Sequence, residues 1–277
     1  MRSIFDQTNP NLLYMKRIFS LLLSGVLLSQ LVFAQIPKAD TLSFLHITDL
    51  HVIFDQKTYT PDFMQYRERY KQDEYILRNF LKEMPAKTKS QMVMATGDMV
   101  DFFEVDLRAP KYLESQVKGF SKLIKKSPVP VYCALGNHDM FSFYWKNGKL
   151  KHDQNSAARS RAYWTRNVEC FKDGITYSKV FNVGQTTYRL IFLDNALYQF
   201  DPAKKSEVPY VDKSQVTWLK SQLKASDNDI EIVFMHIPFE ELKTGNVAEN
   251  ELYSILIHDN AVKLILSGHT LKNRVCL

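Results

Sequence analysis

The amino-acid sequence predicts an α/β domain in which helices are layered on sheets. Three observations support this fold class. Short apolar runs alternate with segments of helical periodicity, prolines and glycines separate these segments, and polar residues recur where the apolar runs end. With 277 residues, of which 45% are hydrophobic, the chain is long enough for one large domain with a substantial core.

The N-terminal segment has the features of a secretory signal peptide. Lys16 and Arg17 precede an apolar run over residues 18–33, and the small residues Val32 and Ala34 stand three positions and one position before the break at Gln35. The alternative is an uncleaved membrane anchor. The run is short for a membrane span and contains several polar side chains, which favours the signal peptide. We therefore expect an exported protein, periplasmic or secreted, with no stable membrane span after cleavage.

The same segment sets the expected domain boundaries. Met15 stands directly before the basic pair and is a plausible start of translation. The signal region is assigned to residues 1–34 and the folded domain to residues 35–277.

The first half of the domain should alternate strands with helices. Helical spacing joins Leu77, Phe80, Leu81 and Met84, and Pro85 should end that helix. A second helical stripe follows later, closed by two prolines. In chain order the expected elements are a strand at 42–47, a helix at 77–84, a strand at 92–95, a helix at 113–124 and a strand at 131–135.

Residues 140–175 are aromatic and basic without a clean period, so we interpret them as an insertion or cap beside the site. Tyr144, Trp145, Tyr163 and Trp164 either pack within this cap or recruit a partner, and packing is the favoured interpretation.

The second half should resume the alternation. Asp212 can cap a helix, with Gln215 three residues later and Val216, Leu219 and Leu223 on the apolar face. The remaining expected elements are strands at 188–193, 230–235 and 262–266 and a helix around 252–256.

Charge and cysteine content exclude some classes of protein. The formal charge of +6 is spread along the chain, with no dense basic block, so nucleic-acid binding is not indicated. Mild basicity suits an anionic substrate or is simply the character of the surface. Cys133, Cys170 and Cys276 do not form a disulfide framework, and Cys133 should be a buried thiol.

Potential metal ligands follow five of the predicted strands. Because parallel strands present their carboxyl ends at one edge of a sheet, these polar blocks should lie together. Four of the seven histidines fall within them, and we assign structural roles to His46, His152 and His258. The blocks are Asp49-Leu50-His51, Gly97-Asp98-Met99-Val100-Asp101, Gly136-Asn137-His138-Asp139, His236-Ile237-Pro238 and Gly268-His269-Thr270-Leu271.

Such a set of side chains suits a two-metal site. Two cations about 3.5–4 Å apart need a shared anionic bridge, and a carboxylate provides it. Neutral imidazole and amide ligands complete the coordination without excess negative charge. The mixed oxygen and nitrogen donors favour manganese, iron or zinc.

Taken together, the five blocks resemble the motifs of the calcineurin-like metallophosphoesterase superfamily: D-x-H, G-D-x-x-D, G-N-H-D/E, H and G-H-x-H. The resemblance covers nearly all of the chain after the signal region. It implies a four-layer α-β-β-α sandwich, with mixed sheets flanked by helices. It also implies two divalent metal ions and hydrolysis of a phosphoric mono- or diester by a metal-bridging hydroxide. The expected partner is a small-molecule phosphoester, and the oligomeric state is left open.

The resemblance also implies a role for each matching residue. Asp49 and His51 would bind the first metal, and Asp98 would bridge both. The ligands of the second metal would be completed by Asn137, His236 and His269. His138 would not be a ligand but would lie over the phosphate as general acid or transition-state stabiliser, oriented by Asp139, while Asp101 would make structural hydrogen bonds. Sharp backbone turns are expected at Gly97, Gly136 and Gly268.

The last block departs from the family pattern. Leu271 stands where a second histidine usually binds the first metal, which would leave three protein ligands there. Only six residues follow it, fewer than family members usually have, so a truncated chain is one expectation. An inactive relative that retains the fold and one metal is therefore the alternative to an enzyme. A surface binding protein is a third possibility.

Overall fold

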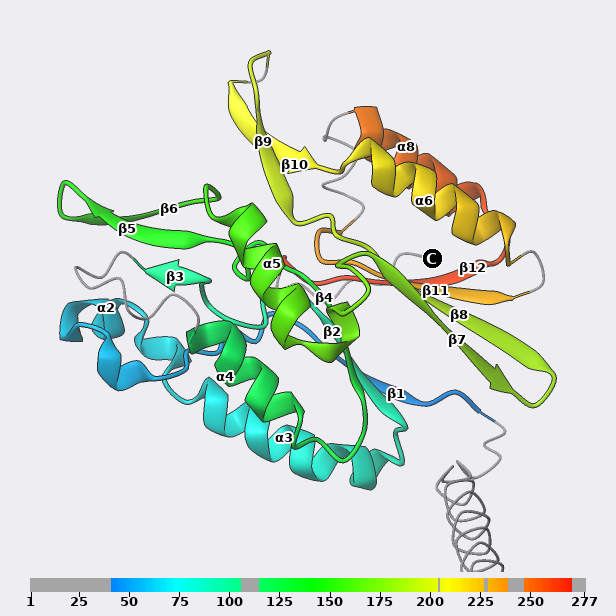
Figure 1. The fold of residues 1–277 in the computed structure, drawn as a ribbon, viewed down its shortest axis with the longest axis horizontal. Helices are drawn as coiled ribbons and strands as arrows, with labels where there is room; N and C mark the ends of the chain where they lie inside the picture. The colour runs from blue at the N-terminus through cyan, green and yellow to red at the C-terminus, as the bar shows by residue number, and fades with distance from the viewer. Residues whose placement is uncertain (1–40, 106–114, 204, 227–228, 239–246, 271–277) are drawn as a thin grey trace, which may run out of the picture. The chain divides into compact units, whose positions relative to one another are not determined.

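The computed structural model describes residues 41–105, 115–203, 205–226, 229–238 and 247–270. The predicted signal region, Leu271 and Cys276 lie outside these described residues. Two main sheets with helices on their outer faces form the centre of the folded unit, and two smaller sheets accompany them (Figure 1).

The first sheet is parallel and has the strand order β1-β2-β4. Its central strand, with the sequence MVMAT, is buried along its whole length, as expected for a parallel strand covered on both faces. Helices α3 and α4 lie along one side of this sheet (Figure 1). The bounds are β1 Phe44–Ile47, β2 Met92–Thr96, β4 Val131–Ala134, α3 Asp73–Thr88 and α4 Ser115–Ile124.

The second sheet has the order β12-β11-β8-β7, parallel except for the antiparallel edge strand β7. Helices α6 and α8 cover its outer face. The bounds are β7 Tyr177–Val183, β8 Thr186–Phe192, β11 Ile230–Phe234, β12 Val262–Leu266, α6 Lys213–Lys224 and α8 Val247–His258.

The two sheets pack face to face through aromatic side chains. Phe192 stacks on Phe234 with ring centroids 4.8 Å apart, and Phe234 meets Phe44 of the first sheet edge-on at 5.7 Å. Alternate residues of β8 and β11, such as Ile191 and Val233, face α6 and α8 instead. The order helix, sheet, sheet, helix confirms the predicted fold class.

The segment over residues 140–175 contains regular elements that the sequence analysis did not predict. β5 (Ser142–Lys146) and β6 (Lys149–Asp153) form a hairpin that pairs with β3 (Glu104–Val105). Helix α5 (Ala157–Asn167) follows, and its Trp164 is fully buried against Phe120. Packing is therefore the correct interpretation for Trp164.

Two further regions complete the described chain. Helix α2 (Pro61–Tyr66) begins at a proline, and Thr60 caps it by accepting a hydrogen bond from Phe63 N. The hairpin of β9 (Leu197–Asp201) and β10 (Ser206–Tyr210) stands apart from both main sheets. Short 3-10 turns are η1 (Gln56–Thr58), η2 (Glu68–Tyr70) and η4 (Glu169–Phe171).

Two helix ends test the sequence predictions. The prediction that Pro85 ends its helix is wrong, because α3 continues to Thr88 with Pro85 buried in its last turn. A proline there removes a single backbone hydrogen bond, and packing offsets that loss. The cap of α6 is confirmed: Asp212 accepts from Ser214 N at 2.7 Å. Gln215 instead bonds the backbone of Asp194.

Cys133 and Cys170 are buried free thiols, which confirms the expectation for Cys133. None of the described helices combines the length and apolar character that crossing a bilayer requires.

Candidate metal centre

The predicted ligands lie where strands of both sheets end. Asp49 and His51 follow β1, Asp98 follows β2, and Asn137 follows β4. From the second sheet, His236 follows β11 and His269 follows β12. Backbone hydrogen bonds join these ends: Asp49 N donates to Gly97 O at 3.1 Å, and Gly268 N donates to His236 O at 2.9 Å.

The backbone is strained at four of these residues. The φ angles are 53° at Asp49, 45° at His51, 50° at Asp98 and 72° at His269. These values lie in the left-handed region, which residues other than glycine rarely adopt. Such strain costs on the order of 1–3 kcal/mol for each residue and is concentrated at functional sites. Its presence at four candidate ligands supports a functional role for this edge of the sheets.

The glycines of the motifs allow a close approach of chain segments. A Cβ on Gly97, whose φ is 95°, would lie 2.4 Å from His236 Nδ1. A Cβ on Gly136 would lie 2.2 Å from an Asp98 carboxylate oxygen. Only Gly97 among the three motif glycines has a positive φ, so the predicted sharp turn applies there, whereas Gly136 and Gly268 provide space.

Asp98 is shared by two groups of potential metal ligands. His51 and His138 lie on one side of it, and His236 and His269 on the other, with the ligand atoms of each group within 4.8 Å of one another. Asp98 is 2% exposed, and its second oxygen, Oδ1, accepts a hydrogen bond from His138 N at 2.8 Å. Asp98 therefore lies where a buried carboxylate could bridge two ions.

His236 is held so that one ring nitrogen faces the centre. Its Nδ1 donates to the Thr96 carbonyl at 2.7 Å. Its Nε2 lies 3.0 Å from Asn137 Oδ1 and 3.3 Å from Asp98 Oδ2. Burial lowers the pKa of His236, but the Asp98 carboxylate outweighs this effect and raises the pKa to about 9. Burial likewise opposes the charge on Asp98, yet the surrounding histidines, His236 first, hold its pKa well below the usual range.

His51 lies between two carboxylates. Its Nε2 is 3.7 Å from Asp98 Oδ2, and its Nδ1 is 3.3 Å from Asp101 Oδ1. Burial lowers the pKa of His51, but Asp101 and Asp98 together raise it above its usual value. The ring stacks on Tyr70, with centroids 4.8 Å apart. A carboxylate behind a histidine is the arrangement that fixes ring orientation in metal sites.

Asp101 is itself held by a buried arginine. Arg67 Nε donates to Asp101 Oδ2 at 2.6 Å, and Arg67 Nη2 donates to Oδ1. The guanidinium lies over the rings of Tyr70 and Phe143 at 4.7 and 5.3 Å from their centroids. The C-terminal end of α2 and the turn after it therefore support the histidines of the centre from behind.

His138 lies at the exposed edge of the centre. Its side chain is 21% exposed, compared with 8% for His51. Its Nδ1 donates to the Asp101 carbonyl at 2.8 Å, which leaves Nε2 available for another partner. Burial lowers the pKa of His138, although Asp98 and Asp101 oppose this effect. Its ring is close enough to Asp98 and His51 to belong to the first ligand group.

Asp139 does not orient His138 as the sequence analysis expected. Its carboxylate accepts hydrogen bonds from Val100 N at 3.0 Å and Gly136 N at 2.7 Å, so it ties together the loops after β2 and β4. Asp101 is the acidic residue that contacts His138. Burial raises the pKa of Asp139 to about 7.

Asp49 and His269 connect the first strand to the last. The Asp49 carboxylate accepts from His269 N at 3.0 Å and from Thr48 Oγ1 at 2.8 Å. The Tyr198 hydroxyl lies 2.9 Å from His269 Nε2. Asp49 adjoins both ligand groups but belongs to neither of them.

Several supporting residues were not predicted from the sequence. Asn195 accepts hydrogen bonds from His236 N and Ile237 N at 2.9 and 3.1 Å. It follows the β8 strand directly, so the rule used for the other polar blocks would have found it. Arg67, Tyr70 and Tyr198 carry no such signal, because only the fold brings them to the site.

The three histidines assigned structural roles lie outside both ligand groups. His46 hydrogen-bonds Thr96 Oγ1 at 2.8 Å, His152 stacks on Phe141, and His258 bonds the Ser254 carbonyl.

Comparison with known families gives a direct match. The family model described as "Calcineurin-like phosphoesterase" matches residues 42–273. This range covers most of the chain and includes all five polar blocks. The chain belongs to the calcineurin-like phosphoesterase family. It is accordingly a metallophosphoesterase, a hydrolase of phosphoric ester bonds. No curated protein matches its sequence.

Similarity to a solved structure supports the fold. A dimetal phosphatase from Danio rerio has a TM-score of 0.52 at 15% identity, with 82% of this chain and 81% of that chain covered. The NAD nucleotidase of Haemophilus influenzae has a TM-score of 0.42 at 15% identity; 83% of this chain is covered, but only 38% of the nucleotidase.

The side chains at the centre fit the divalent ions that the family implies. Asp98 with His51 on one side, and with His236 and His269 on the other, offers oxygen and nitrogen donors whose mutual distances suit one small ion on each side. The Nδ1 atom of His236 is already bound to a fixed acceptor, the Thr96 carbonyl, as the second ring nitrogen of a metal-bound imidazole usually is.

Proposed function

We propose that this metallophosphoesterase hydrolyses a small-molecule phosphoric ester with two divalent ions, manganese, iron or zinc. The sharing of buried Asp98 between two ligand groups is the observation that carries the proposal. When bound, the two ions would neutralise the phosphoryl oxygens and supply an activated water as nucleophile. The ligands of one ion would be Asp49, His51 and Asp98, and those of the other Asp98, Asn137, His236 and His269.

His138 is the proposed general acid. Asp101 contacts two histidines, His51 and His138, and His138 is the more exposed of the two, so an ester can reach its ring. The Asp101 carbonyl fixes the Nδ1 proton, which leaves Nε2 to transfer a proton to the leaving oxygen. A bound phosphoryl anion would raise the pKa of His138 and favour its protonated form.

The test compares leaving groups. With manganese present, the chain should hydrolyse aryl phosphates and aryl phosphodiesters. His138→Gln should reduce the rate about 10²–10⁴-fold for a poor leaving group such as phenol, and much less for nitrophenol, which needs no proton. Asp98→Asn should abolish both reactions, and His258→Gln, at an exposed histidine outside the centre, should leave both unchanged. Full metal loading without turnover on a broad phosphoester panel would contradict the proposal.

The alternative of an inactive relative depends on Leu271, which lies outside the described residues. With three protein ligands, the first ion would bind more weakly than the second. Metal analysis after dialysis separates the two cases. A second manganese that binds only when the ion is in excess supports the enzyme, whereas one ion per chain at all concentrations supports the inactive relative. Leu271→His should increase the affinity of the chain for the more weakly bound first ion.

We further propose that the protein acts outside the cytoplasm. Lys16, Arg17 and the apolar run over residues 18–33 support this proposal. Mass analysis of the protein recovered from cell fractions tests it: the mature chain should begin near Gln35 in an extracytoplasmic fraction. A full-length chain in the cytoplasm would contradict it.

A further inference from the structure

A basic hollow lies between helices α3, α4 and α5, on the helical layer outside the first sheet. Its volume is about 620 Å³, within the range typical of small-molecule sites. Six cationic side chains line it: Arg78, Lys118, Lys122, Lys125, Lys126 and Arg166. None of the eight candidate catalytic and metal-binding residues is among those that line it.

The positive charge of this basic hollow is poorly balanced. Among the described residues that line it there are two carboxylates, Asp55 and Glu74, and Glu74 already pairs with Arg78. Lys122 and Lys125 are one helical turn apart, at the end of α4 and just after it, and like charges at this spacing repel each other. Within the described part of the chain, no acidic side chain forms an ion pair with Lys122. A bound anion would relieve this repulsion.

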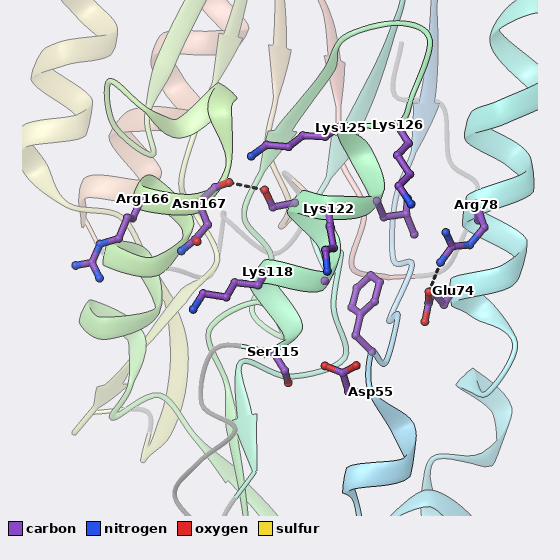
Figure 2. A pocket seen from close by; sticks show the side chains of 14 residues that line it. Asp55, Glu74, Arg78, Ser115, Lys118, Lys122, Lys125, Lys126, Arg166 and Asn167 are labelled. Carbon is purple, nitrogen blue, oxygen red and sulfur yellow. Dashed lines mark hydrogen bonds and ion pairs between the residues drawn. The ribbon is translucent and has the colours of Figure 1, made fainter.

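The cations reach a common space from different elements. Figure 2 shows Lys118, Lys122 and Lys125 extending from α4 and the turn after it, with Arg166 and Asn167 of α5 opposite. Arg78 of α3 and Lys126, after α4, line the other side of the hollow. Gly119 lies in the wall, where a Cβ would meet the Phe54 ring at 2.4 Å, so α4 packs closely on that ring.

The shape of the hollow and the residues that line it favour some classes of anionic ligand over others. A flat membrane surface cannot enter a hollow between helices. Single-stranded nucleic acid needs exposed aromatic rings for stacking, and the one aromatic side chain that lines the hollow, Phe54, is only 5% exposed. Lysine and arginine together are suited to phosphate groups, the former as point charges and the latter through two parallel hydrogen bonds.

We propose that the basic hollow binds a small ligand carrying several phosphate groups. Such a ligand would place several negative charges within a hollow that the six cations line. This site is separate from the metal centre and does not depend on the proposed function.

Binding of tripolyphosphate to the full chain tests the proposal. Calorimetry in EDTA buffer at low salt removes metal from the catalytic centre and stops hydrolysis. One saturable site is expected, with an affinity that falls as salt is added. Lys122→Glu and Arg166→Glu should each weaken binding about tenfold, the effect of losing a charged hydrogen bond. Both positions are exposed, and thermal melting confirms that the variants fold.

A matched control is Lys224→Glu, an equal charge change at the exposed end of α6. It should change the affinity less than about twofold, because screening removes most of its effect at a distance. An equal loss in this control, or no saturable binding by the unaltered chain, would overturn the proposal. So would Lys122-dependent binding to phosphatidylserine vesicles without binding of tripolyphosphate.

Turnover distinguishes the hollow from the catalytic site. Lys122→Glu should leave manganese-dependent hydrolysis of an aryl phosphate unchanged while tripolyphosphate binding falls. A parallel rise in KM for the aryl phosphate would place the hollow within the substrate site and refute a separate one.

Discussion

At the scale of single residues, Arg67 supports the centre without facing a metal. It holds Asp101, which in turn contacts His51 and His138. Arg67→Lys should keep the charge but lose the two parallel hydrogen bonds. We expect kcat to fall about 10–100-fold, as for other residues that orient metal-binding histidines, with a smaller change in KM. Steady-state kinetics with saturating manganese measure both parameters.

The control for this variant is Arg189→Lys. Arg189 pairs with Asp229 at 3.2 Å, next to the amino end of β11 and away from the strand ends that carry the centre. This substitution should lower the melting temperature slightly and leave kcat unchanged. If Arg67→Lys kept full kcat, the supporting role would be wrong.

Glu231 makes stability depend on pH. Its side chain is buried in β11, with Oε1 bonded to Ser226 and Oε2 without a hydrogen bond. Burial raises its pKa from 4.5 to about 7. Its contribution to stability is therefore complete below pH 4.5 and is lost as the pH rises through about 7.

Glu231→Gln should remove this loss. Relative to the unaltered chain, the variant should gain roughly 1–3 kcal/mol at pH 8 and little at pH 5, since it stays neutral at both. Urea unfolding at the two pH values measures the difference. Glu169→Gln, at an exposed carboxylate, should show no such change between the two pH values. A gain for Glu231→Gln that is equal at pH 5 and pH 8 would contradict the explanation.

At the scale of elements, the loop after β2 is packed closely between the loop after β4 and His236, which follows β11. Gly97→Ala would combine a φ of 95° with a Cβ placed 2.4 Å from His236 Nδ1 and 2.7 Å from Gly136. Gly184→Ala, in the β7–β8 turn, also has a positive φ but meets nothing within 4 Å. The control should cost about 1–2 kcal/mol from strain alone.

Gly97→Ala should cost about 1–3 kcal/mol more than the control because of the overlap, and should weaken manganese binding. Chemical unfolding and metal titration of both variants measure the two effects. Equal costs for the two substitutions would show that the close packing at Gly97 is not important.

The sequence was sufficient to predict the strands that form the layers but not all the elements between them. Strands β1, β2, β4, β8, β11 and β12 are short apolar runs followed by polar blocks, so their positions could be predicted. The β5–β6 hairpin was missed although Asn147-Gly148, both with positive φ, carries the usual signal of a tight turn. Strand β7 alternates between partly buried and exposed residues as a sheet edge does, which weakens the apolar signal.

The same distinction applies to the candidate site. Residues within motifs could be assigned from sequence, because the chain itself places them at strand ends. Arg67 and Tyr198 come from a helix end and a separate hairpin, and their contacts with Asp101 and His269 exist only in the folded chain. The role given to Asp139 was wrong for a related reason: sequence adjacency to His138 did not determine which carboxylate the ring contacts.

At the scale of the whole molecule, the metal centre joins the two sheets. Asp49, Asp98 and Asn137 come from the first sheet, and His236 and His269 from the second. Ions bound there should cross-link the layers and favour the folded chain by about 2.7 kcal/mol at one hundred times the Kd. The melting temperature should rise with manganese and fall with EDTA. His269→Ala should lose most of this rise, and His258→Ala should keep it.

Metal binding should also release a proton. In the metal-free protein His236, with a pKa of about 9, is protonated at neutral pH, whereas Asp98 carries its charge because its pKa is lowered. A metal ion requires neutral imidazole, so binding below pH 9 displaces the His236 proton. Affinity should therefore rise at least about tenfold for each pH unit between pH 6 and 8. Calorimetry at pH 7 in two buffers with different ionisation enthalpies should count at least one proton per centre, because His51, whose pKa is also raised, adds to the proton released by His236. An enthalpy independent of buffer, together with an affinity constant across this range, would mean that His236 is already neutral before the metal arrives.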